Sequence, residues 1–176
     1  MRKHSETEGE GIMKFETKSL IRTALLLAIT LVVQFLKMPQ LITGSLVNAM
    51  LVITTGTVGL FSGISIGLLT PVIAFLVGIL KFPPMIPFII VGNALYTWLY
   101  YSQKNAVIGI PLAAVVKYMW LSISAKYILK GLGIKVPPMV VQAFTLPQLI
   151  TALLGGVIGM ALILLLQRYF ANTENI

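Results

Sequence analysis

The sequence predicts an all-α integral membrane protein, folded as a bundle of six transmembrane helices. Of its 176 residues, 57% are hydrophobic and only 10% are charged, whereas about a quarter of the residues in a soluble domain are usually charged. The apolar residues also form runs close to the roughly 20 residues that a helix needs to cross the hydrocarbon core of a bilayer. Composition and run length together place the chain in a membrane.

Six apolar runs approach the length of a membrane span. They comprise residues 20–36, 43–61, 63–80, 85–102, 106–127 and 145–167. Pro, Gly and Lys stand between them, as expected between helices, and five or seven spans remain alternatives. The second and third runs meet at GLFSG, where we expect a tight turn or a short, partly re-entrant third helix. The chain then divides into a polar cytoplasmic tail (1–18), a transmembrane substrate-binding domain (19–168) and a second cytoplasmic tail (169–176).

Basic residues predict the orientation of the bundle. Six spans put both termini on one side, and Lys and Arg are enriched in cytoplasmic segments. The terminal side holds Arg2, Lys3, Lys14, Lys18, Arg22, Lys104 and Arg168. The other side holds Lys37, Lys81, Lys130 and Lys135. The larger number on the terminal side predicts that both termini are inside.

Several function classes lack their residues. The formal charge is +8, but the basic residues form no stripe with interleaved aromatics, which argues against nucleic-acid binding. The chain has no cysteine and no constellation typical of a hydrolase or a metal site. It has no phosphate-binding G-x-x-x-x-G-K-[ST] loop and no intramembrane carboxylate or histidine for proton relay. We expect neither an enzyme nor a resident cofactor or metal. If the chain binds a solute for active transport, a partner protein must supply the energy.

Four polar residues lie inside the predicted spans. At 1.5 Å per residue, Asn48, Asn93, Lys117 and Gln148 all fall in the outer half of the membrane. Hydrogen-bonding side chains from four helices at one depth predict a solute pocket open to the outside. Intramembrane Asn and Gln also join helices to each other, and Gln148 is close enough to the surface to be a solvated cap.

Lys117 carries the strongest signal. A lysine at the centre of a membrane helix costs about 2.5–3.5 kcal/mol, and all five acidic residues lie outside the predicted spans. Three alternatives follow: the lysine is uncharged, water and backbone carbonyls solvate it, or its partner is an anionic or carbonyl-bearing ligand. We favour a ligand contact.

Aromatic and small residues extend these predictions. Trp120 shares a helix face with Lys117, and Tyr96 shares one with Asn93. Both are therefore candidate pocket walls, although core packing explains either one alone.

Small residues four apart let helices approach closely. They occur at Ala24 and Ala28, at Gly63 and Gly67, and at Gly155 and Gly159, and we expect most of them to pack inside the bundle.

The chain resembles the substrate-binding S components of energy-coupling factor (ECF) transporters, the vitamin importers of prokaryotic plasma membranes. The resemblance rests on TGSLVNAMLVI, GLLTPVIAFLVGI, FPPMIPFIIVGNALY, AAVVKY and FTLPQLITALLGG. It implies that this chain associates with a transmembrane coupling protein and two ABC ATPases and topples in the membrane to release its ligand inside. Ala24 and Ala28 would then meet the coupling protein, and the loop between the first two helices, including Thr43, would help to close the pocket. The family motif often has proline where this chain has Ser45.

The residues narrow the ligand only to a class. The lack of acidic residues argues against a cationic ligand such as thiamin. Lys117 with Asn and Gln favours a carboxylate or a carbonyl-rich heterocycle: a pantothenate-like compound, a flavin, a pyrimidine or another vitamin or cofactor precursor. Two other classes stay open, a partner-independent secondary carrier and a membrane scaffold subunit whose polar residues only join helices.

Overall fold

The protein is helical in every regular element that the structure describes. A computed structural model describes residues 2–103 and 105–173, with side chains for 16–103, 105–169 and 171–172. The long helices are α1 (Arg2–Phe35), α2 (Gln40–Thr57), α3 (Leu60–Leu76), α4 (Ile86–Ser102), α5 (Ala106–Ile123) and α8 (Leu146–Thr173). The short elements are η1 (Pro83–Met85), η2 (Ser124–Ile128), α6 (Leu129–Gly131) and α7 (Pro138–Ala143).

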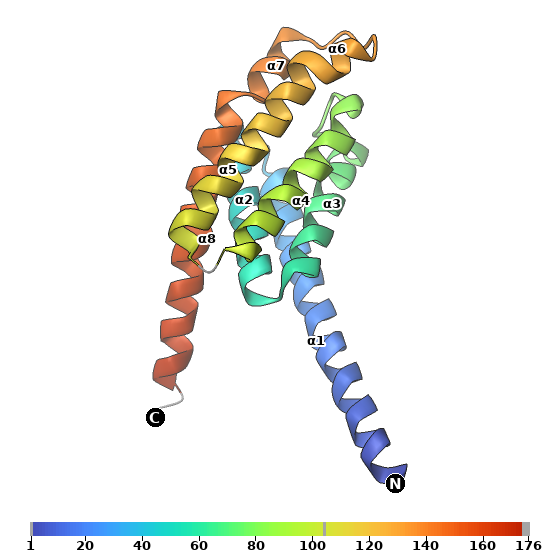
Figure 1. Ribbon diagram of the computed structural model, residues 1–176, viewed down its shortest axis with the longest axis vertical. Coiled ribbons are helices and arrows are strands. Elements are labelled where there is room, and N and C mark those ends of the chain that lie inside the picture. Colours follow the sequence, from blue (N-terminus) through green and yellow to red (C-terminus); the bar gives the residue numbers. More distant parts are fainter. Residues whose placement is uncertain (1, 104, 174–176) are drawn as a thin grey trace.

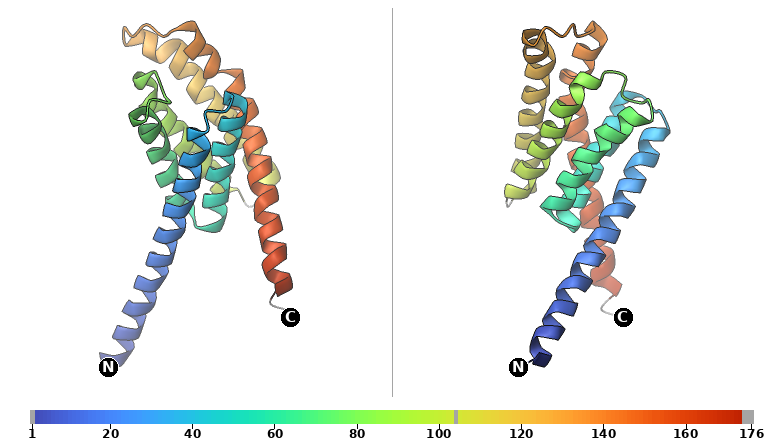
Figure 2. Two further views of the ribbon diagram at one scale, coloured as in Figure 1. Left: turned by 180° about the vertical axis from the view of Figure 1, so that it is seen from behind. Right: turned by 90° about the vertical axis from the view of Figure 1, so that its right-hand side faces the viewer.

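The long helices form an antiparallel bundle. The short connections before α2, α3 and α5 return the chain alongside the preceding helix, as they do in helix bundles. The start of α1 and the end of α8 lie at the same end of the molecule, and α6 and α7 lie at the opposite end (Figures 1 and 2). Helix α2 is central, because it contacts α1, α3, α4 and α8.

Three helical stretches in the described part of the chain are long and apolar enough to cross a membrane. They are Glu16–Phe35, Ala106–Gly131 and Pro138–Tyr169, and the apolar helix Leu60–Leu76 is shorter. The all-helical architecture is as predicted, whereas the count of six spans stays a prediction.

Several helix ends differ from the predicted runs. The break between α2 and α3 falls at Val58 and Gly59, so it includes the first glycine of GLFSG, where a tight turn is predicted. Gly59 has φ +130°, a conformation that suits glycine. Helix α5 continues through the π-helical turn η2 and α6 to Gly131, four residues beyond the predicted end. Helix α1 begins at Arg2, so it includes residues of the predicted polar tail.

Glycines allow α8 to pack closely on α2. A Cβ on Gly155 would lie 2.5 Å from Asn48 Cβ and 2.9 Å from the backbone nitrogen of Ala49. A Cβ on Gly159 would lie 2.9 Å from both the Ala49 carbonyl oxygen and Val52 Cβ. The predicted packing role of this glycine pair inside the bundle is therefore confirmed.

The core has two clusters of buried apolar residues. The larger one joins α2, α3, α4, α5 and α8 around Leu51, Ile66 and Tyr96. The smaller one, which includes Met85, Leu129 and Phe144, joins η1, α5, η2, α6 and the end of α7. The smaller cluster holds the loop-bearing end of the bundle together, next to the cavity described below.

Candidate functional site

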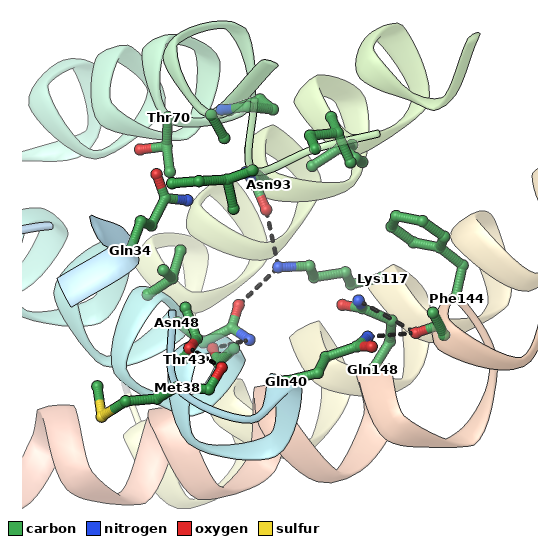
Figure 3. Close-up of a pocket in the computed structure, with 18 of the residues that line it drawn as sticks. Gln34, Met38, Gln40, Thr43, Asn48, Thr70, Asn93, Lys117, Phe144 and Gln148 are labelled. Carbon is green, nitrogen blue, oxygen red and sulfur yellow. Dashed lines mark hydrogen bonds between the residues drawn. The ribbon is translucent and has the colours of Figure 1, made fainter. Parts of the chain in front are cut away.

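A cavity of about 370 Å³ lies between the helices near the end that carries α6 and α7 (Figure 3). Its volume is within the range of about 300–1,000 Å³ for small-molecule sites. The polar residues that line it are Gln34, Lys37, Gln40, Thr43, Asn48, Thr70, Asn93, Lys117 and Gln148. The apolar and glycine residues are Met38, Gly44, Val47, Pro71, Ala74, Ile79, Leu80, Ile89, Ala143 and Phe144. Each of the six long helices contributes at least one polar residue.

Lys117 lies at the centre of the polar lining. Its side chain is 3% exposed. Its Nζ donates hydrogen bonds to Asn48 Oδ1 at 2.6 Å and to Asn93 Oδ1 at 2.7 Å. The structure therefore joins three predicted site residues from α5, α2 and α4 in one buried cluster (Figure 3). Lys117 is held by side-chain amide oxygens, an arrangement absent from the three alternatives derived from the sequence.

The other end of each asparagine amide fixes its orientation. Asn48 Nδ2 donates to the Gly44 carbonyl at 2.9 Å, and Asn93 Nδ2 donates to the Gly67 carbonyl at 2.9 Å. Gly67 stands four residues before Pro71, which lies inside α3 and has no N–H to donate to that carbonyl. Asn93 therefore satisfies a carbonyl that proline leaves without its helical partner, and this contact turns its own amide oxygen towards Lys117.

Among the described residues, the cluster has no acidic partner. An ammonium group has three N–H donors, and among the described residues Asn48 and Asn93 accept two of them. The Lys117 Nζ also lies 5.2 Å from the centre of the Tyr96 ring, within cation–π distance. Every acidic residue is in the first 16 residues or at position 174. One donor of the lysine is thus free to bind an acceptor in the cavity.

Gln148 and Thr43 also line the cavity. Gln148 Nε2 is 3.5 Å from the Ala143 carbonyl oxygen, which Gln40 Nε2 contacts at 2.8 Å. Thr43 donates to the Met38 carbonyl at 2.9 Å. Thr43 belongs to the first turn of α2 rather than to the preceding loop, where the family resemblance implied it. Its hydrogen bond attaches that turn to the connection between α1 and α2.

Tyr96 and Trp120 do not line the cavity, contrary to the predicted aromatic walls. Tyr96 is fully buried and donates from its hydroxyl to the Ala152 carbonyl at 2.8 Å. Trp120 Nε1 donates to the Phe88 carbonyl at 2.9 Å, and its ring packs on that of Phe88 at 6.1 Å. Sharing a helix face with a site residue did not suffice, because both side chains find partners on neighbouring helices. Among the described lining residues, the aromatic one is Phe144.

Sequence reasoning missed four polar lining residues, Gln34, Lys37, Gln40 and Thr70. Gln34 lies at the end of the first apolar run, where it reads as an interfacial residue, and Thr70 precedes Pro71 within the third. Both are buried. Each is a polar side chain at about the same depth as the four predicted polar residues. This shared depth is evident only once the packing of the helices is known.

Comparison with known families decides the identity of the chain. The family model for the ECF transporter substrate-specific component matches residues 18–167. The chain belongs to this family. Comparisons with curated proteins and with solved structures give no match.

Membership in the ECF substrate-specific component family gives the chain its general role. It is the substrate-specific subunit of an ECF transporter, a multi-pass membrane protein that associates with ECF coupling components and ATPases. Such components are transporter subunits rather than enzymes. Within the described residues, no group of three or more His, Cys, Asp or Glu side chains is placed to hold a metal ion.

The ECF component presents an open face on α1. Ala24 and Ala28 are both exposed, as are Ile21, Leu25 and Val32. The two alanines are one helical turn apart, so they lie on the same face of α1. Unlike Gly155 and Gly159, this pair is not covered by the described part of the bundle.

Proposed function

We propose that this ECF component binds a vitamin or cofactor precursor in the cavity around Lys117 and delivers it to the ATP-driven coupling module. The ligand is an anionic or carbonyl-rich small molecule, such as a flavin, a pyrimidine or a pantothenate-like compound. Lys117 donates to its carboxylate or carbonyl oxygen. Asn48 and Asn93 hold the ammonium in place, and Gln148 and Thr43 lie on the surrounding wall.

The observation that carries this proposal is the buried lysine with an unused donor. Burying an ammonium without a counter-charge is costly unless its donors are satisfied. Two amide oxygens satisfy part of that requirement, and a ligand oxygen completes it. Because no carboxylate of the described residues lines the cavity, the site favours ligands that bring negative charge or carbonyl dipoles.

The direction of loading follows from the position of the cavity. Lys37, Met38, Ile79 and Leu80 belong to connections between helices and line the cavity. These connections are at the end opposite the start of α1. With six spans and both termini inside, as the basic residues predict, the cavity opens to the outside of the plasma membrane. Lys104, one of the basic residues in that argument, lies outside the described residues.

The coupling surface is proposed to include Ala24 and Ala28. Their exposure on α1 leaves room for a helix of another subunit. Small side chains allow two helices to approach closely in a membrane. The coupling protein would pack on this face while the ligand is held in the cavity next to Gln34, in the last turn of α1.

The test compares Lys117→Met with Lys126→Met. Methionine keeps most of the length of the lysine side chain and removes its donors. Lys126 is exposed on the same continuous helix, so its substitution is the matched control. We expect the ligand to bind Lys117→Met about 30-fold more weakly or worse, as expected when a buried charged partner is removed.

Mass spectrometry of small molecules released from the purified, detergent-solubilised protein provides the measurement. We expect a single cofactor-like compound from the wild type and from Lys126→Met, and none from Lys117→Met. If a folded Lys117→Met protein retains the same compound in full, Lys117 does not bind the ligand.

A further inference from the structure

Gln34 carries a buried amide oxygen without a hydrogen-bond donor. It lies in the last turn of α1, is 9% exposed and lines the cavity. Its Oε1 has no partner among the described residues. Nearly all buried polar atoms in proteins have a partner, so this oxygen requires an explanation.

The threonine hydroxyl groups on this side of the bundle already donate to backbone carbonyls. The Thr70 hydroxyl donates to the Ile66 carbonyl at 2.6 Å, and the Thr30 hydroxyl, one turn before Gln34, donates to the Leu26 carbonyl at 2.7 Å. Lys117 donates to Asn48 and Asn93, and its third donor is the one that the proposed function assigns to the ligand. The amide oxygen of Gln34 is therefore an acceptor that the described chain leaves for another molecule.

Gln34 and Lys117 offer opposite hydrogen-bonding groups to one cavity. In the view of Figure 3, Gln34 and Thr70 are on one side of the Lys117 ammonium, and Gln40, Gln148 and Phe144 are on the other. Lys117 can only donate, whereas the Gln34 oxygen can only accept. A ligand that satisfies both must carry an acceptor and a donor.

We propose that Gln34 determines the specificity of the site by accepting an N–H or O–H from the ligand whose oxygen binds Lys117. This inference rests on the proposed function and narrows its substrate class. It selects amides, ring imides and hydroxy acids over simple carboxylates that lack a donor. A ligand without the donor leaves the buried oxygen unpaired, and sites built around a hydrogen bond discriminate strongly against such analogues.

The experiment uses three probes of the proposed classes: orotate, lumiflavin and pantothenate. Orotate and lumiflavin each have a counterpart in which N-methylation removes every ring N–H donor. These are 1,3-dimethylorotate, which lacks both donors of orotate, and 3-methyllumiflavin, which lacks the single donor of lumiflavin. Binding is measured by calorimetry on the purified full chain in detergent. The variants are Gln34→Met, which keeps side-chain length without the acceptor, and Gln167→Met, a control at an exposed position of α8.

We expect the wild type and Gln167→Met to bind at least one parent probe about tenfold more tightly than Gln34→Met does. For a ring probe, the wild type should also prefer the parent over its N-methyl counterpart by about tenfold, and Gln34→Met should lose that preference. The comparison of parent and N-methyl probes on the wild type does not depend on the folding of any variant.

Two results would overturn the inference in distinguishable ways. Equal binding of a parent probe by wild type and Gln34→Met, with no penalty for N-methylation, means that Gln34 holds only water, and it leaves the proposed function standing. Binding of no parent probe to the wild type overturns the ligand classes of the proposed function and this inference together.

Discussion

Ala24 and Ala28 on α1 and Gly155 and Gly159 on α8 share one spacing but have opposite surroundings. The alanines are exposed, whereas added Cβ atoms on the glycines would collide with α2. Both pairs bring small residues onto one helix face. The difference teaches that such spacing predicts close approach of a helix without saying whether that helix belongs to the same chain.

The largest effect is expected at the buried pair, from Gly155→Ala. The new Cβ would meet the Ser45 carbonyl oxygen, Asn48 Cβ and the Ala49 backbone nitrogen, and backbone atoms of a packed helix cannot easily move aside. We expect the free energy of unfolding to fall by about 3 kcal/mol, measured by thermal unfolding in detergent. Gly131→Ala is the control, since a Cβ there meets nothing within 4 Å. Equal stability of the two variants would show that α8 does not pack closely against α2 at Gly155.

A different outcome is expected at the exposed pair, from Ala28→Leu. Leucine is nearly as good a helix former as alanine, so the stability and ligand affinity of the isolated chain should stay within about 1 kcal/mol of the wild type. Uptake by proteoliposomes containing the coupling protein, both ATPases and ATP should fall about tenfold or more, because the larger side chain holds the coupling helix away. Ala161→Leu, at an exposed position of α8, should transport normally. Normal uptake by Ala28→Leu would move the coupling surface elsewhere.

The contrast between the two pairs also explains how much of the structure the sequence alone could predict: features set within one segment, but not contacts between segments. Hydropathy and helix-breaking residues predict the helical bundle, because they act within one segment. The choice of Lys117, Asn48, Asn93 and Gln148 also followed from local information, since each is a polar residue at a similar depth. The structure brings the first three together and places all four on the cavity.

What the sequence could not supply depends on contacts between segments. Trp120 turns to the Phe88 carbonyl and Tyr96 to that of Ala152, and neither acceptor can be inferred from helical periodicity. The sequence could not single out Gln34, because its importance lies in a missing hydrogen-bond donor, which only the packing of the helices reveals. The amides that hold Lys117 belong to helices distant in sequence, and their orientation depends on backbone carbonyls.

The third small-residue pair, Gly63 and Gly67 on α3, links packing to the site. A Cβ on Gly67 would lie 2.9 Å from Asn93 Cβ, and the Gly67 carbonyl accepts the Asn93 amide N–H. This carbonyl lacks its helical donor because Pro71 has no N–H. Here the small residue serves a polar contact within the binding cluster, in addition to close packing.

The smallest effect is expected from a double-mutant cycle between Asn93→Leu and Pro71→Ala. Alone, Asn93→Leu leaves the Gly67 carbonyl unpaired and should lower the free energy of unfolding by about 2 kcal/mol. With Pro71→Ala, the new backbone N–H at position 71 can bond that carbonyl, so Asn93→Leu should cost about 1 kcal/mol less. The loss of one Lys117 acceptor is common to both backgrounds and cancels.

The control for this cycle pairs Asn93→Leu with Pro111→Ala, because Pro111 lies inside α5 at an exposed position. Thermal unfolding in detergent measures all of these variants, and the two substitutions of the control should be additive within about 0.5 kcal/mol. Additivity between Asn93 and Pro71 as well would mean that the proline does not direct the amide. The hydrogen bond to Lys117 alone would then orient the Asn93 amide, and the geometry of the site would not depend on the packing of α3.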